Sequence, residues 1–381
     1  MKKRDRRGVS RREFLKTGLL GAAALGLGPT IILPRRFALY AGGESTHPNI
    51  SPLRVVGLED PKMTTDVVPE CNWQRQEELV KAEVVAENMD RLACALAQEK
   101  DPAAAWRAIF LKPAAKAWSD TVAAIKVNCI AQQRTRSAVF FKVITTLTDV
   151  LGLKGENIFV YDACHGDAMT RTTGRGAWLV AQKLPNGAQA VGKWGSYNAP
   201  VTVGKPWKDG SQQAKCLDHL VQGKVDILVN VALCKGHGDE FGRFTLAMKN
   251  HFGTFDPGPS HSGGGPTNPA DYVIAINKTP QILGDMDPAT GKVLFPRQQL
   301  VLVDCLWASD PGPGGEATHQ PNRLFMGTLP PVVDYLVATK FRRDAMGWKT
   351  NDALATRFLT EFGYQPGDLP QGGEIVNALA G

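Results

Sequence analysis

Apolar residues recur along this chain with two different periods. Residues 79–98 repeat them at near-helical spacing, which predicts an amphipathic helix. Asp101 and Pro102 are a good N-cap and first-turn pair for a second short helix that runs to residue 110. The preceding residues, 44–76, are polar and interrupted by four prolines, so we expect an irregular arm on the surface there.

Beyond residue 119 the pattern changes to short β-branched runs that alternate with longer amphipathic segments. The predicted strands cover residues 122–129, 157–163, 188–191, 225–233 and 299–305. The predicted helices cover residues 137–151, 175–184, 212–222, 241–251, 270–283, 331–346 and 352–362. Strands that are almost continuously apolar and separated by helices predict an α/β fold, with a mostly parallel sheet and helices on both faces.

The start of the chain predicts an export signal. A basic stretch at residues 1–16 contains the pair Arg11 and Arg12, and an uncharged run rich in Gly and Ala follows it at residues 17–34. This order is typical of twin-arginine signals. We therefore expect a periplasmic protein that meets the Tat translocase during export and is cleaved near Ala41. The alternative is a retained anchor, in which case the uncleaved signal is the membrane contact.

These patterns divide the chain into three parts. Residues 1–41 are the expected signal sequence, residues 42–118 the irregular arm with the N-terminal helices, and residues 119–381 the α/β domain, closed by C-terminal helices.

The signal also accounts for the basic charge of the chain. The whole sequence has 44 Lys and Arg, 37 Asp and Glu, and a formal net charge of +7. Residues 1–41 hold ten of the basic and two of the acidic residues, which leaves 34 and 35 and a nearly neutral mature chain. This balance gives no electrostatic footprint for nucleic acid, and we exclude a nucleic-acid partner.

Polar side chains and thiols gather at the ends of four predicted strands. The thiols are Cys129, Cys164, Cys234 and Cys305, and the same strands carry Asn128, Asp162, Asn230 and Asp304. Because ligands bind outside the carboxyl ends of strands in an open parallel sheet, we expect these groups to share one rim. For any one of these cysteines taken singly, the alternative is that its small apolar side chain only fills a tight space at the strand end. Together they suit a soft metal ion, an iron–sulfur cluster or one nucleophilic thiol.

The densest polar segment follows the fourth predicted strand and contains Lys235 and His237. His237 is a candidate general base or metal ligand, and Lys235 or Lys249 can neutralise an acidic substrate or a developing oxyanion. A favourable charge at the end of a helix is the alternative explanation for Lys249 and His251.

Two Gly-rich loops, at residues 260–266 and 310–316, do not have the phosphate-binding patterns of nucleotide-binding proteins. We expect surface turns there, and flexible covers of an active site are the alternative. The chain also lacks the GxSxG and HExxH motifs, which argues against an α/β-hydrolase and a zincin.

The segments described above resemble the family known as domain of unknown function 362, in particular its branch exported by the twin-arginine route. The matching motifs are Lys-Val-Asn-Cys at residues 126–129, Asp162, Lys235-x-His237 and Lys-Asn-His-Phe-Gly at residues 249–253. The likeness extends over roughly residues 79–345. It implies an α/β fold and a common site around Lys126, Asn128, Cys129, His237, Lys249, His251 and Asp304, but no reaction.

The sequence departs from the family at two places. Leu329 stands where the family tends to have Asp, and the CxxC-type iron–sulfur appendage of some members is missing. Any cluster would therefore be built from the strand-end cysteines.

Three functions stay open at this stage. The first is binding of a metal ion or a redox cofactor such as an iron–sulfur cluster, with Cys129, Cys164, Cys234, His237 and His251 as metal ligands. The second is a cofactor-free enzyme for a small acidic substrate, with Cys129, Lys235, His237, Lys249 and Asp304 as catalytic residues. The third is a non-catalytic binding or assembly protein. In the first two, a small-molecule or metal ligand is the expected partner, and further candidates to contact a cofactor are Lys126, Asn128, Asp162 and Asn250.

Overall fold

The computed structural model describes residues 47–130, 132–162, 183–191, 199–207, 212–261, 269–287, 289–290, 292–370 and 373–379. The expected signal sequence, Cys164 and most of the helix expected at residues 175–184 lie outside the described residues. Within the described part, no helix is both long and apolar enough to cross a membrane.

Eight strands form the central sheet, in the order β14-β1-β13-β12-β9-β2-β5-β6. Their bounds are β1 (Val56–Glu59), β2 (Ala123–Lys126), β5 (Ile158–Tyr161), β6 (Gln189–Val191), β9 (Ile227–Lys235), β12 (Gln298–Ser309), β13 (Arg323–Gly327) and β14 (Val376–Asn377). The five strands from β12 to β6 are parallel, whereas β13 is antiparallel to both of its neighbours. The mostly parallel sheet expected from the apolar runs is confirmed.

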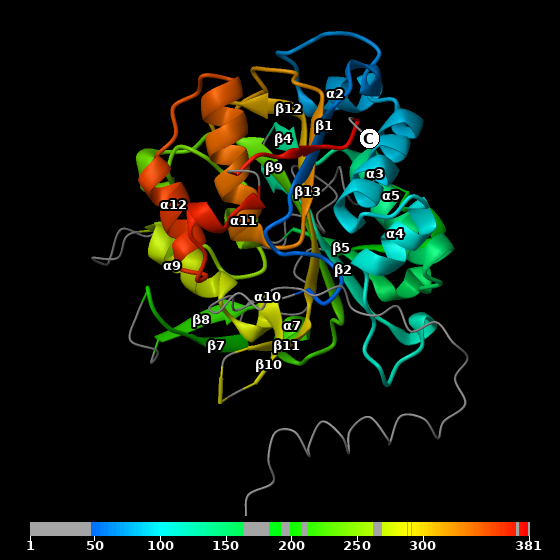
Figure 1. The fold of residues 1–381 in the computed structure, drawn as a ribbon, viewed down its shortest axis with the longest axis vertical. Coiled ribbons are helices and arrows are strands. Elements are labelled where there is room, and N and C mark those ends of the chain that lie inside the picture. The colour runs from blue at the N-terminus through cyan, green and yellow to red at the C-terminus, as the bar shows by residue number, and fades with distance from the viewer. Residues whose placement is uncertain are drawn as a thin grey trace, which may run out of the picture. The chain divides into compact units, whose positions relative to one another are not determined.

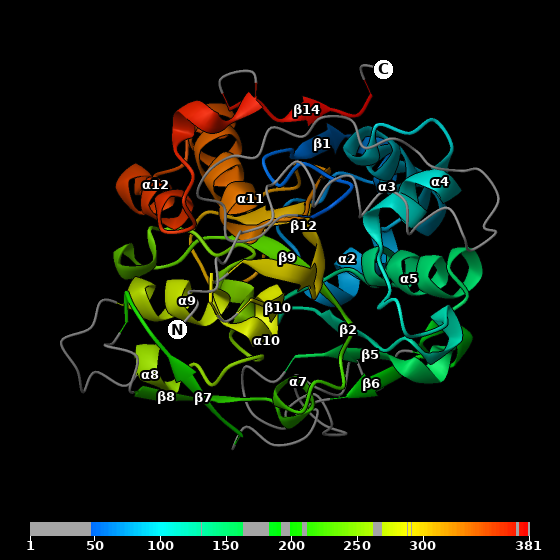
Figure 2. The same ribbon diagram turned by 60° about the horizontal axis from the view of Figure 1, so that its bottom comes forward.

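Helices cover both faces of the sheet. Successive residues of each strand point to opposite sides, and because these residues are apolar, both faces must be covered. Ile125 and Val229 belong to one buried core, and Ala124 and Leu228 to the other. The helices α3 (Ala82–Ala97), α4 (Pro102–Ile109) and α5 (Ser137–Thr145) lie on the first side, and α9 (Pro269–Asn277), α11 (Pro330–Leu336) and α12 (Asp352–Thr360) on the second (Figures 1 and 2). The expected α/β architecture is therefore present.

Shorter elements complete the described part. The helices are α2 (Trp73–Leu79), α7 (Asp218–Val221), α8 (Gly258–His261) and α10 (Pro280–Leu283), and two π-helical segments, η4 (Thr146–Val150) and η11 (Val337–Ala345), extend α5 and α11. Single 3-10 turns are η2 (Pro61–Met63), η3 (Trp118–Asp120), η5 (Gly155–Asn157), η8 (Pro185–Gly187), η9 (Asp239–Phe241), η10 (Lys249–His251) and η12 (Pro366–Asp368). Three two-stranded sheets pair β3 (Cys129–Ile130) with β4 (Gln133–Arg134), β7 (Ala199–Val203) with β8 (Gln212–Cys216), and β10 (Gly284–Met286) with β11 (Val293–Pro296).

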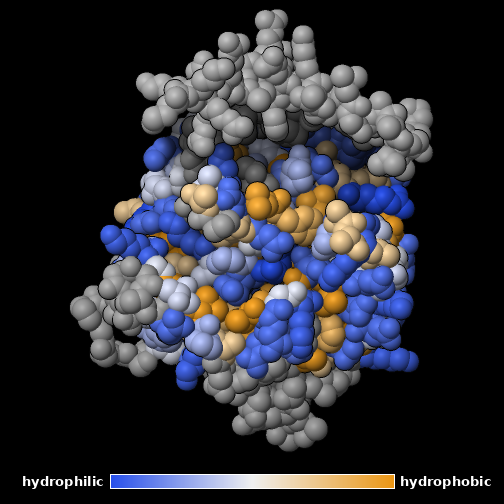
Figure 3. All heavy atoms as spheres, turned by 90° about the horizontal axis from the view of Figure 1, so that it is seen from below, coloured by the Kyte–Doolittle hydropathy of each residue, from blue (hydrophilic) through white to orange (hydrophobic). Residues whose placement is uncertain are grey.

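The pairs β7–β8 and β10–β11 lie at the lower end of the molecule in Figure 1. Seen from that side, the described surface is mostly hydrophilic, with hydrophobic residues in small separate patches (Figure 3). Leu294 of β11, 70% exposed, is one of the few large apolar side chains that the described surface presents to solvent.

Three sequence expectations are wrong. The helix expected at residues 241–251 is a series of turns, because Gly242 and Arg243 take positive φ angles of 77° and 62° and Thr245 pairs with Lys235 instead. The first half of the helix expected at residues 212–222 is strand β8. The arm expected at the surface contributes β1 to the central sheet, where Val56 is fully buried.

Candidate functional site

The chain reverses its direction across the sheet between β2 and β9. From β2 it moves to β5 and β6 on one side, and it then returns to β9 and β12 on the other. In open parallel sheets, ligands bind at the carboxyl ends of the strands where such a reversal occurs. Lys126 ends β2 and Lys235 ends β9, and the register places Lys126 beside Asn230. The two lysines therefore flank the position that topology favours for a ligand.

Lys126 is completely buried and held on several sides. Its Nζ donates to the Val127 carbonyl oxygen at 2.7 Å and lies 3.2 Å from a carboxylate oxygen of Asp162, at the end of β5. The other Asp162 oxygen accepts a hydrogen bond from the backbone N–H of Cys129 at 2.8 Å. Asp162 thus ties the ends of β2 and β5 together.

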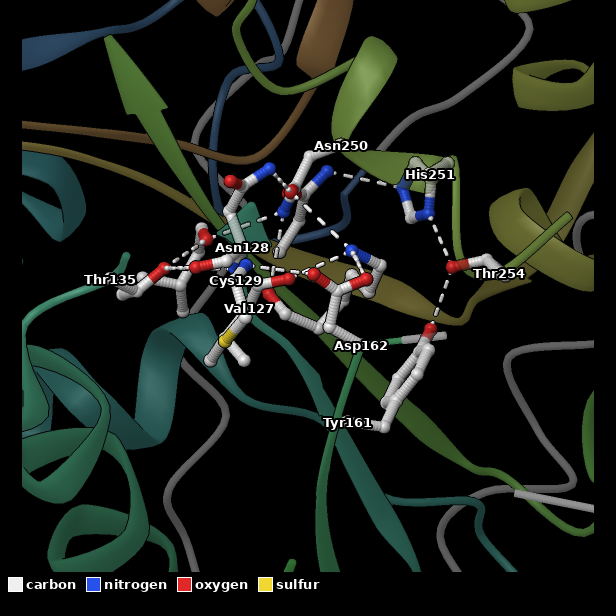
Figure 4. Close-up of polar contacts among 12 residues, drawn as sticks. Val127, Asn128, Cys129, Thr135, Tyr161, Asp162, Asn250, His251 and Thr254 are labelled. Atoms are coloured by element: carbon white, nitrogen blue, oxygen red, sulfur yellow. Dashed lines mark hydrogen bonds and ion pairs between the residues drawn. The ribbon is translucent and has the colours of Figure 1, made fainter. Parts of the chain in front are cut away.

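Two carboxamides, those of Asn128 and Asn250 (labelled in Figure 4), connect Lys126 to Lys235. Lys126 Nζ lies 3.5 Å from Asn250 Oδ1, the same oxygen accepts from Asn128 Nδ2 at 3.1 Å, and Asn128 Oδ1 accepts from Lys235 Nζ at 2.8 Å. Thr135 fixes Asn128 by accepting from its backbone N–H at 2.9 Å. We call these four residues, Lys126, Asn128, Lys235 and Asn250, the lysine–amide chain.

A second network holds the loop that carries Asn250. Asn250 Nδ2 donates to Asn230 Oδ1 at 2.8 Å, and Asn230 Nδ2 in turn contacts His251 Nε2 at 3.1 Å. His251 also contacts Gln298 and Thr254. Burial lowers the pKa of His251 to about 3, so its ring is neutral near pH 7 and positions the loop without charge.

Asp334 of α11 holds the same loop from its other side. Its two carboxylate oxygens accept from the backbone N–H groups of Ala247 and Met248 at 2.7 and 2.9 Å. Burial raises the pKa of Asp334 to about 7, against the opposing effect of these two hydrogen bonds. A carboxylate from a helix distant in sequence therefore shapes the segment before Lys249, by accepting hydrogen bonds from its backbone.

Lys249 and His237 share an aromatic contact. Lys249 Nζ lies 4.3 Å from the ring centre of Phe241 and 5.0 Å from that of Phe252, and the His237 ring packs edge-on against Phe241 at 4.5 Å. His237 Nδ1 accepts from the Gly238 N–H at 2.8 Å and lies 3.2 Å from a carboxylate oxygen of Glu240. The ring of His237 is therefore held by its own loop and by Phe241.

Asp304 lies in an arrangement of its own with Arg136. One of its oxygens accepts from the Arg136 backbone N–H at 2.7 Å and lies 3.4 Å from Arg136 Nε, and the other accepts from the Leu306 N–H at 3.2 Å. Burial raises the pKa of Asp304, whereas Arg136 opposes that rise. These contacts fix the start of α5 to β12, and both oxygens of the Asp304 carboxylate accept hydrogen bonds from the protein itself.

Cys129 lies apart from Cys234 and Cys305. Burial and then the Asp162 carboxylate raise the pKa of the Cys129 thiol well above its usual range, which disfavours the thiolate that a nucleophile needs. Cys234 and Cys305 lie together on the other side of β9, where Arg342 Nη1 contacts the Cys234 sulfur at 3.7 Å. Burial alone would raise the pKa of Cys234, but the hydrogen bond with Cys305 and the Arg342 charge outweigh it and lower the pKa to about 7.

The proposed metal ligands do not form one group in the described part of the chain. There, no cluster of three or more His, Cys, Asp or Glu side chains is placed to hold a metal ion. Cys129 and Cys234 belong to the cores on opposite faces of the sheet. His251 is enclosed in the asparagine network, and Cys164 lies outside the described residues.

The structure therefore unites Lys126, Asn128, Asp162, Lys235 and Asn250 and places the other candidates around them. Sequence reasoning missed two residues that shape the surroundings, Arg342 and the aromatic partner Phe241. A carboxamide within the apolar run of β9, Asn230, was a visible signal for the network, whereas nothing local in the sequence marks Arg342.

Comparison with known proteins adds a family to this geometry. A sequence model described as Domain of unknown function (DUF362) matches residues 123–339, which span the parallel strands from β2 to β12 and every member of the lysine–amide chain. No curated protein and no solved structure matches the chain. The match extends over more than half of the sequence, and the chain belongs to the DUF362 family.

Proposed function

We propose that this protein binds a small anion, a carboxylate or a phosphate compound, at the carboxyl ends of β2 and β9. The observation that carries the proposal is the lysine–amide chain at the reversal point of the sheet. Two buried ammonium groups and two amides meet where an α/β sheet places its ligand.

The energetics of burial support a functional role for these lysines. Moving a charged group from water into the protein interior costs several kcal/mol. Replacing a buried ion pair by well-packed apolar side chains therefore often leaves a protein equally stable or more stable. A positive potential at a binding site is a reason to keep such groups, because it attracts and holds an anion in a region of low dielectric.

Two side chains at the edge of the lysine–amide chain, Asn128 and Lys249, are placed to touch the ligand. Asn128 and Lys249 are 4% and 9% exposed to solvent, whereas Lys126 and Lys235 are fully buried. The Lys249 ammonium is a hydrogen-bond donor, and it shares its contact with Phe241 with the His237 ring. Donors of this kind recognise anions, whereas protonated ammonium groups do not coordinate a soft metal ion.

Titration of the full-length protein with inorganic phosphate, pyrophosphate and succinate tests the proposal by calorimetry and thermal unfolding. We expect saturable binding of at least one of these anions, and stabilisation by about 2.7 kcal/mol at a hundredfold excess over Kd. Lys249→Met should weaken binding at least tenfold and Lys235→Met should abolish it. The control Lys349→Met alters an exposed lysine and should leave binding unchanged.

Two results would overturn the proposal. One is the absence of saturable binding of all three anions to wild type, and the other is equal affinity in wild type and Lys249→Met. Elemental analysis of the same preparation distinguishes the metal-binding alternative, which requires a stoichiometric metal that is lost on replacing Cys129 or His237.

We also propose that the site works in the periplasm. The support is the twin-arginine pattern at residues 1–41, with its basic stretch, its paired arginines and its mildly apolar run.

A further inference from the structure

Two cysteines lie side by side in the core behind the lysine–amide chain. The ladder between β9 and β12 pairs Leu233 with Asp304 and then breaks until Lys235 pairs with Ser309. Cys234 therefore faces a bulged stretch of β12 that begins at Cys305. Both thiols are fully buried in the same core.

We propose that Cys234 and Cys305 are a redox pair that a peroxide closes into a disulfide, and that closure weakens the anion site through the adjacent Lys235. The regulatory half of this inference rests on the proposed anion-binding function. The disulfide itself does not.

The geometry favours the bond on two counts. Disulfides join residues whose Cα atoms are about 4.4–6.8 Å apart, a range that includes the roughly 4.8 Å spacing of neighbouring strands. The bulge leaves Cys305 outside the ladder between β9 and β12, so an adjustment towards Cys234 breaks no pair of that ladder, while Cys305 stays paired with Arg323 of β13.

Arg342 supports the first chemical step. Its guanidinium is completely buried, contacts the Cys234 sulfur at 3.7 Å and is also held by the Ser309 carbonyl oxygen at 3.3 Å. A cation held against a thiol stabilises the thiolate, which is the nucleophilic form. Cys234 is therefore the attacking sulfur and Cys305 the resolving one.

The reaction balances with hydrogen peroxide as the oxidant. The Cys234 thiolate attacks one peroxide oxygen, the O–O bond breaks, and hydroxide leaves, which gives a sulfenic acid on Cys234. The Cys305 sulfur then attacks the Cys234 sulfur, the S–O bond breaks, and the Cys305 proton leaves with the hydroxyl group as water. Two thiols are oxidised by two electrons, and one peroxide is reduced to two molecules of water.

Lys235 connects the pair to the site. It follows Cys234 directly, and its Nζ donates to Asn128 Oδ1 at 2.8 Å across the gap between β9 and β2. A disulfide draws the end of β9 towards β12 and away from Asn128. We expect the oxidised protein to bind its anion about tenfold more weakly, a change of about 1.4 kcal/mol.

Peroxide treatment of the full-length protein tests both halves. We expect the intact mass to fall by two hydrogen atoms, peptide mapping to find Cys234 joined to Cys305, and thiol reductants to reverse both changes. Cys234→Ser and Cys305→Ser should each prevent the cross-link. Cys94→Ser, which alters a half-exposed cysteine on α3, should not.

Peroxide that leaves the pair reduced, or that joins other cysteines instead, would overturn the redox pair. A Cys234–Cys305 disulfide with unchanged affinity for the anion found with reduced wild type would overturn the coupling. If reduced wild type binds none of the probe anions, the anion site and the coupling fail together, while the mass and mapping data still decide the redox pair.

Discussion

The side chain of Asn250 contacts three other polar residues of the site, which its position in the sequence does not reveal. Its oxygen serves Asn128 and Lys126, and its nitrogen donates to Asn230. Because each partner is buried, removing the amide leaves polar atoms without the hydrogen bonds that compensate for their burial. The residue therefore supports the site as a whole.

This role predicts the result of a truncation. Asn250→Ala should reduce the free energy of unfolding by about 3 kcal/mol, because it strips acceptors from two polar groups beside a buried charge. Urea denaturation of both proteins measures the difference. Asn49→Ala, which removes an exposed side chain bonded to the Ala108 carbonyl oxygen, is the control and should cost well under 1 kcal/mol. Equal losses in the two variants would contradict the network.

His251 predicts a dependence of stability on pH. Its folded-state pKa of about 3 is below the unfolded value of 6.5, so between these limits the unfolded chain binds a proton that the folded protein does not. The stabilisation is complete above pH 6.5 and is lost as pH falls towards 3. Between pH 8 and 5 we expect His251 to contribute a loss of about 2 kcal/mol.

Denaturation of His251→Gln across the same range isolates this contribution. The variant is expected to be less stable than wild type at pH 8, because it loses ring contacts, but to have a shallower decline towards pH 5. A slope identical to that of wild type would show that His251 titrates normally in the folded protein.

The connection after β9 shows how backbone contacts shape one element. A Cβ atom on Gly236 would lie 1.6 Å from the Asp310 carbonyl oxygen, and one on Gly312 would lie 1.7 Å from the Gly236 carbonyl oxygen. The Gly236 N–H also donates to the Ser309 carbonyl oxygen at 2.7 Å. Two glycines therefore let the Gly-rich loop pack directly on the segment that carries Lys235 and His237.

Gly236→Ala should consequently destabilise the protein by about 1–3 kcal/mol and weaken anion binding, because backbone must move to make room. Gly315→Ala is a matched control in the same loop, since a Cβ there meets nothing within 4 Å. Thermal unfolding compares the two. A Gly236→Ala protein as stable as Gly315→Ala would contradict the close packing.

Helices and strands that follow from the local pattern of apolar residues were predictable from the sequence. Those that depend on pairing with residues far along the chain were not. The parallel strands β2, β5, β9 and β12 were found because burial on both faces makes them nearly continuous in apolar residues. Strand β1 is only four residues long and is a strand because β13, far along the chain, pairs with it. The segment at residues 241–251 has a helical spacing of apolar residues, but pairing of Thr245 with Lys235 overrides it.

The same distinction applies to the site. Strand order puts Lys126, Asn128 and Lys235 at one rim, whereas the strand-end pattern singled out the thiols and named only Asn128 of these three residues. Whether two strand-end cysteines meet depends on the face to which each side chain points and on local bulges. Cys129 and Cys234 therefore lie in different cores, while Cys234 meets Cys305.

At the scale of the whole molecule, the sheet separates two cores and the candidate site lies at the ends of the neighbouring strands β9 and β2. Helices from both faces reach this point, since Asp334 of α11 holds the Asn250 loop and Arg136 joins α5 to β12. A change in either layer can therefore alter the anion site without touching the ligand.

The charge of the whole chain gives the last prediction. Residues 1–41 carry ten basic and two acidic residues, so a chain cleaved near Ala41 changes from a net charge of +7 to nearly neutral. Periplasmic protein should therefore have a much lower isoelectric point than the precursor, with a new N-terminus near residue 42. Replacing Arg11 and Arg12 by lysine keeps the charge but removes the paired guanidinium groups that define the signal. The variant should stay in the cytoplasm at full length, as fractionation and intact mass would show, whereas export of the double-lysine chain would contradict the twin-arginine route.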